Sequence, residues 1–197
     1  MRHSVALLWE GDTSTQEDDA TLVRAAQVDP AAFAHIYARY RHRVYAYVRG
    51  RLPSEEDAAD VTQYVFLRAL DALPRYRSRT APLSAWLFRI ARNAVTDVQR
   101  RQHPASAWEG MAGRIEAQAD QNQDVEAQVL QREAVARLHA LLRALDPDTR
   151  DLLMLRFAAG LTSAEIGVVI DKSHAATRKR LARAIHSLKE QYDEPIA

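Results

Sequence analysis

Basic side chains recur at helical spacing near the end of the chain, where they could bind a polyanion. A helix is expected over 174–190, and at about 100° per residue its apolar side carries Leu181, Ile185 and Leu188, with Thr177 one turn earlier. The opposite side carries Lys179, Ala182, Arg183 and His186, and Arg178 and Arg180 lie on the flanks. Arg and Lys donate hydrogen bonds to phosphates and to guanine O6 and N7 in the major groove. A surface helix that is merely basic is the alternative. The candidate contact residues are Arg178, Lys179, Arg180, Ala182, Arg183 and His186.

A second basic stretch, residues 75–80, lies between two expected helices and contains an aromatic residue. An aromatic ring flanked by cations can stack on an unpaired base and hold its backbone. Tyr76, with Arg77 and Arg79 beside it, is the candidate; the alternative is that its ring covers the helix junction. Trp86 lies on an apolar stripe, so we expect it in the core.

Residue types that carry covalent or metal chemistry are scarce or badly spaced. There are no cysteines, which excludes thiol catalysis, disulfides and zinc ribbons. The seven histidines form no His-x-x-x-His pair, and no Gly-rich phosphate loop occurs. The acidic run Glu55-Glu56-Asp57 is explained by a helix N-terminus, where carboxylates favour the dipole. We therefore expect no catalytic residue, no metal site and no cofactor.

Charge is distributed in blocks although the net charge of the 197 residues is only +1. The net charge is −4 over 1–30, +7 over 31–104, −4 over 105–133 and +4 over 134–190. Two basic blocks separated by an acidic one suggest two modules that face a polyanion. No apolar run approaches ~20 residues and no signal peptide is evident, so we expect a cytoplasmic protein without membrane insertion.

Helical periodicity predicts an all-α fold of two small helical domains. The first domain is a three-helix unit that follows a weak helix near 21–28, and it closes at Pro104. Its helices are expected to begin at Pro30, Ser54 and Pro82. The Ala- and Gln-rich residues 105–123 are typical of a flexible linker.

The second domain is predicted to end in a helix-turn-helix. A helix over 125–144 comes first, and Asp146-Pro147 then caps a helix over 147–158 that carries Leu152, Leu153, Leu155 and Phe157. Thr162 and Glu165 form a capping box for a short helix, and Asp171-Lys172 makes the turn before Ser173 caps the last helix. A short helix, a tight turn and a longer basic helix are typical of DNA-binding proteins.

Several segments together resemble the bacterial sigma-70 superfamily, and the length matches its extracytoplasmic-function (ECF) type. Asp60-Val-Thr-Gln63-Tyr-Val-Phe66-Leu-Arg68 resembles the polymerase-binding helix, and Trp86-Leu-Phe-Arg-Ile-Ala-Arg-Asn93 resembles the following one. The stretches 145–157 and 161–166, with Arg180-Leu-Ala-Arg183, resemble the promoter-reading C-terminal domain. The resemblance covers roughly residues 25–103 and 131–191.

The resemblance implies a transcription initiation factor that binds core RNA polymerase and directs it to promoters. The implied partners are the clamp helices of the largest polymerase subunit, the polymerase flap, promoter DNA and an anti-sigma factor. The polymerase-binding residues it implies are Asp60, Gln63, Tyr64, Phe66 and Arg68. The −10 element and its opened strand would contact Tyr76, Arg77, Arg79, Arg89, Arg92, Asn93, Asp97, Arg100 and Arg101. The helix 174–190 would read the −35 element.

Some positions depart from the family pattern. Tyr64 and Ala59 stand where acidic residues are usual, and Asp171 replaces the usual Gly of the turn. Asp tolerates the left-handed conformation, so the turn is expected to form at some cost. Ala175-Ala176-Thr177 replaces the usual Gly-Thr-Val, so no −35 sequence is inferred from relatives.

The expected organisation has four parts: an acidic extension over 1–24, a polymerase-binding and −10 domain over 25–103, a linker over 104–130, and a −35 domain over 131–192. A one-component helix-turn-helix repressor with a helical dimerisation domain is the alternative. It would bind palindromic DNA without any affinity for polymerase. The basic block 75–101 argues against it, because a dimerisation domain does not require one.

Overall fold

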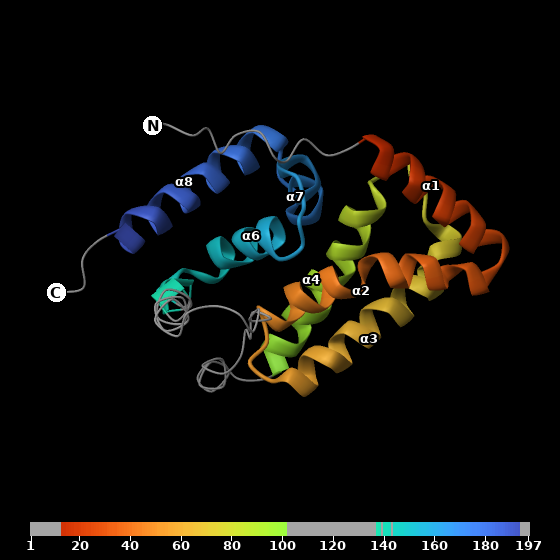
Figure 1. Ribbon diagram of the computed structural model, residues 1–197, viewed down its shortest axis with the longest axis horizontal. Coiled ribbons are helices and arrows are strands. Elements are labelled where there is room, and N and C mark those ends of the chain that lie inside the picture. The colour runs from red at the N-terminus through yellow and green to blue at the C-terminus, as the bar shows by residue number, and fades with distance from the viewer. Residues whose placement is uncertain (1–12, 102–136, 139, 143, 194–197) are drawn as a thin grey trace, which may run out of the picture.

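The computed structural model describes residues 13–101 and 137–193, except residues 139 and 143 (Figure 1). These residues form helices and connecting turns, and no strand occurs in this part of the chain. The predicted linker and most of the helix expected over 125–144 lie outside the described residues; of its end, residues 137, 138, 140–142 and 144 are helical.

The first helical unit contains four α-helices and two short 3-10 turns. Their bounds are α1 Thr13–Val28, η2 Pro30–Ala32, α2 Phe33–Arg49, α3 Glu55–Ala72, η3 Leu73–Arg75 and α4 Leu83–Arg101. Asp29 caps η2 by accepting from the backbone N–H of Ala31, and Ser54 caps α3 by accepting from Asp57. Helix α3 packs between α2 and α4, and α1 packs across α2.

The second unit contains α6 Pro147–Phe157, α7 Ser163–Ile170 and α8 His174–Asp193. Asp146 caps α6 by accepting from the N–H of Thr149, with Pro147 at the first helical position, as predicted. Thr162 and Glu165 form the predicted capping box of α7. Asp171 ends α7 in the left-handed conformation, with φ of 56°, which also agrees with the prediction for the turn.

The two units share one buried hydrophobic cluster, although the sequence indicated two separate modules. Helix α4 contacts α3 on one side and α7 on the other, so it is buried on two faces. The apolar stripe expected on this helix from its sequence comprises Trp86, Leu87, Ile90, Ala91, Ala94 and Val98. Phe88 and Val95 lie outside that stripe and are also fully buried. The apolar residues on the second face of α4 are explained by the packing of the second unit.

Some sequence predictions differ from the structure in extent. Helix α1 begins at Thr13, so the boundary expected between residues 24 and 25 falls inside a helix that packs on α2. Phe157 is 66% exposed although it was expected on the buried side of α6, because it occupies the last turn. Ile185 is 39% exposed, and Ala184 takes its place on the buried side of α8 with Leu181. No helix in the described ranges is both long and apolar enough to cross a membrane.

Candidate nucleic-acid and polymerase interfaces

The helix-turn-helix is closed by a tight approach between α7 and the turn that follows it. A Cβ atom on Gly167 would lie 2.7 Å from the carbonyl oxygen of Lys172 and 3.3 Å from Oγ1 of Thr177. Thr177 is fully buried, and its hydroxyl donates to the carbonyl of Ser173 at 3.0 Å. Gly167, which was not among the predicted site residues, allows this packing because it has no side chain.

One face of α8 carries the predicted contact residues, and the structure leaves most of them accessible. Arg180 is half-buried and lies 3.8 Å from Asp148 of α6, so it is partly engaged within the protein. His186 pairs with Glu190 one turn on, at 3.3 Å. The exposed residues of this face are Arg178, Lys179, Ala182, Arg183 and His186.

The predicted −10 contact residues of α4 fall into two groups that differ in their surroundings. Arg89 donates to the carbonyl of Val168, and Arg92 donates to Asp151 at 2.7 Å, so both contact the second unit. Burial alone would lower the pKa of Arg92, but the hydrogen bond and charge of Asp151 outweigh it and raise the pKa. The exposed group lies further along the helix and comprises Asn93, Asp97, Arg100 and Arg101.

In the loop before α4, the basic side chains are exposed to solvent and the aromatic ring is buried. Tyr76 is 6% exposed, its ring lies 4.8 Å from that of Trp86, and its hydroxyl donates to the carbonyl of Ala81 at 2.6 Å. Tyr76 is therefore corrected from a stacking candidate to a residue that covers the helix junction. Arg77 and Arg79 are exposed, as a DNA contact requires. Trp86 packs against the core, which agrees with its apolar stripe.

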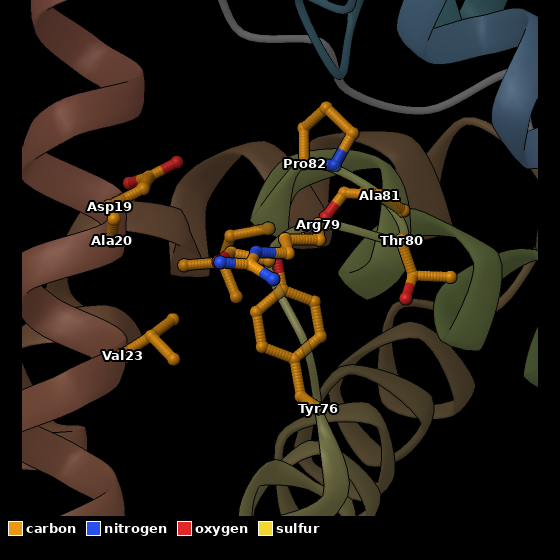
Figure 2. Close-up of a pocket in the computed structure, with 10 residues that line it drawn as sticks. Asp19, Ala20, Val23, Tyr76, Arg79, Thr80, Ala81 and Pro82 are labelled. Carbon is orange, nitrogen blue, oxygen red and sulfur yellow. Dashed lines mark hydrogen bonds between the residues drawn. The ribbon is translucent and has the colours of Figure 1, made fainter.

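A small cavity of about 220 Å³ separates this loop from α1 (Figure 2). Asp19 and Val23 of α1 line one side, and Tyr76 and Arg79 line the other. Asp19 accepts a hydrogen bond of 2.5 Å from the Tyr40 hydroxyl and lies 3.4 Å from the Arg39 guanidinium. Its burial raises its pKa, and Tyr40 and Arg39 offset part of the effect. This role of Asp19 was not predicted, because the residue was assigned to the acidic extension expected over 1–24.

Helix α3 presents the predicted polymerase-binding residues beside an apolar groove. Asp60, Gln63, Tyr64 and Arg68 are exposed, whereas Phe66 is 4% exposed. The Phe66 ring packs edge-on against Tyr37 at 4.8 Å and against Phe33 at 6.4 Å. Phe66 therefore packs beneath this surface, and its buried ring offers little area for contact with a partner.

The groove between α2 and α3 encloses about 740 Å³. Two residues at the groove were not predicted as contacts: Tyr37 on α2 is 43% exposed, and Leu67 on α3 is 55% exposed. Large apolar side chains left in contact with water around a hollow mark an interaction surface. The residues that line the groove include Phe33, Tyr37, Tyr45, Gln63, Phe66, Leu67 and Leu70.

The helix-turn-helix and the basic, all-helical unit that accompanies it define a DNA-binding transcription factor. The Sigma-70 region 2 family matches residues 36–104, and the Sigma-70, region 4 family matches residues 141–190. The ECF RNA polymerase sigma factor SigD of Mycobacterium tuberculosis is 32% identical over 186 residues, spanning 88% of this chain and 82% of SigD. The chain belongs to the ECF sigma factors of RNA polymerase.

Other relatives agree with this assignment. The ECF RNA polymerase sigma-E factor of Escherichia coli is 30% identical over 178 residues, spanning 87% of this chain and 92% of the relative. The structure of CnrH in complex with the cytosolic domain of CnrY superposes with a TM-score of 0.65 at 26% identity, covering 89% of this chain and 97% of CnrH. RpoE from Bartonella quintana, at 18% identity and a TM-score of 0.62 over 81% of this chain and 95% of RpoE, shares the fold.

Family membership establishes the main prediction from the sequence, namely a transcription initiation factor that acts with core RNA polymerase at promoters. Sigma factors are non-enzymatic initiation factors. The alternative of a one-component repressor is thereby set aside.

Proposed function

We propose that separate surfaces of this chain bind RNA polymerase and read promoter DNA. The α2–α3 groove and the exposed residues Asp60, Gln63, Tyr64 and Arg68 bind the clamp helices of the largest polymerase subunit. The α8 face with Lys179 and Arg183 reads the −35 element, and the second unit meets the polymerase flap. The observation that carries the proposal is the α8 face, where exposed cations project from a complete helix-turn-helix.

The −10 element is assigned to the loop 76–82 and α4. Arg77, Arg79, Arg100 and Arg101 are exposed and can donate to the backbone of an opened strand. Asn93 and Asp97 lie on α4 among them and offer hydrogen-bonding groups to base edges. Holding unpaired bases favours strand opening without hydrolysis, so the chain itself needs no catalytic residue, metal or cofactor.

An anti-sigma factor is proposed as a further partner. Support comes from RpoE of Bartonella quintana, which shares this fold and was solved with the anti-sigma factor NepR. Because polymerase and chromosomal DNA are cytoplasmic in bacteria, we place the chain there.

The proposal is tested by adding the purified chain to core RNA polymerase and sequencing the 5′ ends of the transcripts made on genomic DNA. We expect transcripts that start downstream of a shared −10 and −35 pair and that disappear when the chain is omitted. Binding to palindromic DNA with no stable polymerase complex would contradict the proposal.

A further inference from the structure

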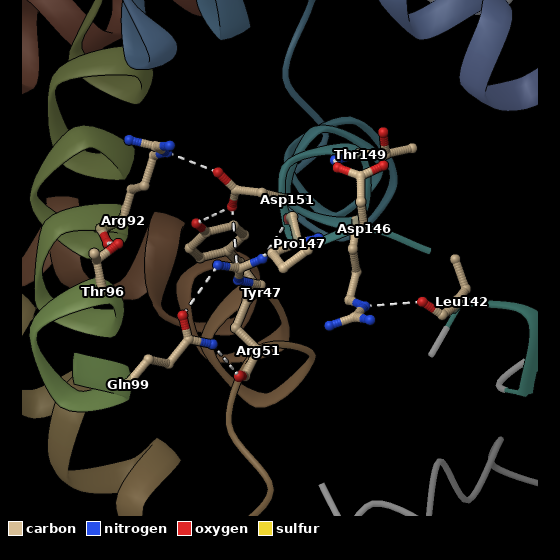
Figure 3. A network of polar contacts seen from close by, with 11 residues as sticks. Tyr47, Arg51, Arg92, Thr96, Gln99, Leu142, Asp146, Pro147, Thr149 and Asp151 are labelled. Carbon is tan, nitrogen blue, oxygen red and sulfur yellow. Dashed lines mark hydrogen bonds and ion pairs between the residues drawn. The ribbon is translucent and has the colours of Figure 1, made fainter. Parts of the chain in front are cut away.

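Helix α6 carries a buried carboxylate that lies at the junction of the two units. Asp151 is 3% exposed, and its contacts reach across to the first unit (Figure 3). Tyr47 donates its hydroxyl hydrogen to Oδ1 at 2.6 Å, and Arg92 donates to Oδ2 at 2.7 Å. Arg51 lies 3.7 Å from Oδ1 and donates to the carbonyl of Pro147 at 3.1 Å. Both oxygens of the Asp151 carboxylate therefore have hydrogen-bond or ion-pair partners: two guanidinium groups and one phenol.

Elsewhere at the junction, the two units are joined by hydrogen bonds and by close packing. Arg43 donates to the carbonyl of Ala159 at 2.7 Å, just beyond the end of α6. Ser84 donates to Glu165, and Arg89 donates to Val168. A Cβ atom built on Gly50 would lie 1.9 Å from Cε of Met154, so the end of this flexible side chain occupies space that the glycine leaves open.

We propose that this face of α2 and α4 is a docking surface for the chain's own α6 and α7, with Asp151 at its centre, and that docking withholds Arg92 and Arg89 from DNA. This inference rests on the proposed function, which assigns α4 to the −10 element; the family resemblance places both arginines among the DNA contacts of that helix. Guanidinium groups pair with phosphate in the same fork geometry as with carboxylate. The backbone of the opened strand and Asp151 therefore compete for Arg92.

The physical chemistry of the contact makes it reversible. The free energy of removing two opposite charges from water offsets much of the free energy gained from their attraction. When the units separate, both charges are hydrated again. If only a fraction of the chains is open at any time, the apparent affinity for DNA equals the intrinsic affinity of the open form multiplied by that fraction. Weakening the junction is thus expected to increase DNA affinity without adding any contact.

Two variants open the junction by independent means. Asp151→Asn keeps the shape of the side chain and removes its charge, whereas Gly50→Trp inserts a ring where Met154 lies. Neither residue belongs to the proposed DNA or polymerase surfaces. Asp71→Asn is the matched control, because it removes one exposed carboxylate from α3 and leaves the junction intact. Circular dichroism checks that each variant remains helical.

Opening is measured by spin-label distances in the full chain. The chain has no cysteines, so Ala38→Cys on α2 and Lys189→Cys on α8, both at exposed positions, give two specific attachment points. DNA binding is measured by fluorescence anisotropy with a short single-stranded oligonucleotide of mixed sequence, at several salt concentrations and without polymerase.

We expect longer label distances and about tenfold tighter binding for both variants, with a salt slope steeper by about 1.4 for two additional phosphate contacts. Adding Arg92→Ala to Asp151→Asn should remove most of the gain. Unchanged distances in both variants would overturn the proposal, as would longer distances with an affinity no higher than that of Asp71→Asn. These readouts need no polymerase, so a failure of the transcription assay would leave them interpretable.

Discussion

The hydroxyl of Tyr76 donates a hydrogen bond of 2.6 Å to the carbonyl oxygen of Ala81, which joins the two ends of the loop that precedes α4. Burial raises the pKa of Tyr76 to about 12, so the donor proton is retained throughout the neutral range. Gln27 of α1 donates to the carbonyls of Leu73 and Tyr76 at 2.9 and 3.0 Å. The loop that presents Arg77 and Arg79 is thus held at both ends.

The first prediction tests this closure. Tyr76→Phe keeps the ring against Trp86 and removes only the donor, leaving a half-buried carbonyl without its partner. We expect a loss of about 1 kcal/mol in the free energy of unfolding, measured by urea denaturation. Tyr64→Phe removes a hydroxyl from a ring that is 51% exposed and should change stability little. Equal midpoints for the two variants would show that the loop is held by other contacts.

The second prediction concerns the left-handed residue between α7 and α8. Asp171 has φ of 56° and ψ of 52°, a conformation that glycine adopts without steric cost. Asp171→Gly should therefore stabilise the chain by about 1 kcal/mol, and Asp171→Ala should destabilise it by a similar amount. Differential scanning calorimetry measures both. A lower melting temperature for the glycine variant would mean that the carboxylate of Asp171 contributes more than the backbone strain costs.

The third prediction concerns the ionisation of Asp19. Because burial raises its pKa above the usual 3.8, the folded chain favours the protonated form. Its stabilising contribution is complete below that usual value and is lost as the pH rises through the raised pKa.

Asp19→Asn does not ionise and can still accept from Tyr40. The stability of the parent chain minus that of Asp19→Asn should therefore fall as the pH increases through the weakly acidic range. Urea denaturation of both chains between about pH 3 and pH 7 gives this difference. A difference that increases with pH would show that Arg39 and Tyr40 outweigh burial.

The fourth prediction concerns polymerase docking. Asp60→Ala with Gln63→Ala should abolish holoenzyme formation and leave helicity and melting unchanged, because both side chains are exposed on α3. Tyr37→Ala should also weaken the complex, since it removes one wall of the groove. His35→Ala, exposed on α2 outside the groove, is the control. Co-purification of the double variant with core polymerase at the parental yield would contradict the assignment of α3.

The fifth prediction separates base reading from backbone contact on α8. Arg183→Ala or Lys179→Ala should relax the preference at one or two −35 positions, since a base contact is worth ~1–3 kcal/mol of discrimination. Arg180→Ala should instead weaken binding to all sequences alike, because this guanidinium lies at the flank beside Asp148. Transcription from a −35 library measures the preference. If Lys179→Ala and Arg183→Ala both keep the parental preference, Arg178 becomes the candidate reader.

The sequence predicted the helices and their caps well because both depend on neighbours along the chain. Ser54, Asp146 and the Thr162–Glu165 pair satisfy backbone groups within three residues, and the structure places each as predicted. Family membership confirmed the fold class and the main function. Local spacing could not predict Asp151 as a junction residue, because its partners Tyr47 and Arg92 lie 104 and 59 residues away.

The same limit explains the errors at individual site residues. Tyr76 looked available because its neighbours in sequence are polar, but Trp86 and Ala81 cover it from the other side of the loop. Tyr37 and Leu67 were not predicted as contact residues, yet they remain accessible at the groove. Whether a side chain is exposed depends on which helices pack against its own helix. The periodicity of a single helix does not contain that information.

The pairing of Ser84 with Glu165 has an evolutionary consequence. Glu165 closes the capping box of α7 and also accepts from Ser84 on α4, so one side chain serves two helices from different halves of the chain. A substitution at position 165 therefore alters the start of α7 and the surface of α4 together. Among descendants of this chain, residues 84 and 165 should change in concert, and recombinants that exchange one half with a distant homologue should inherit mismatched pairs.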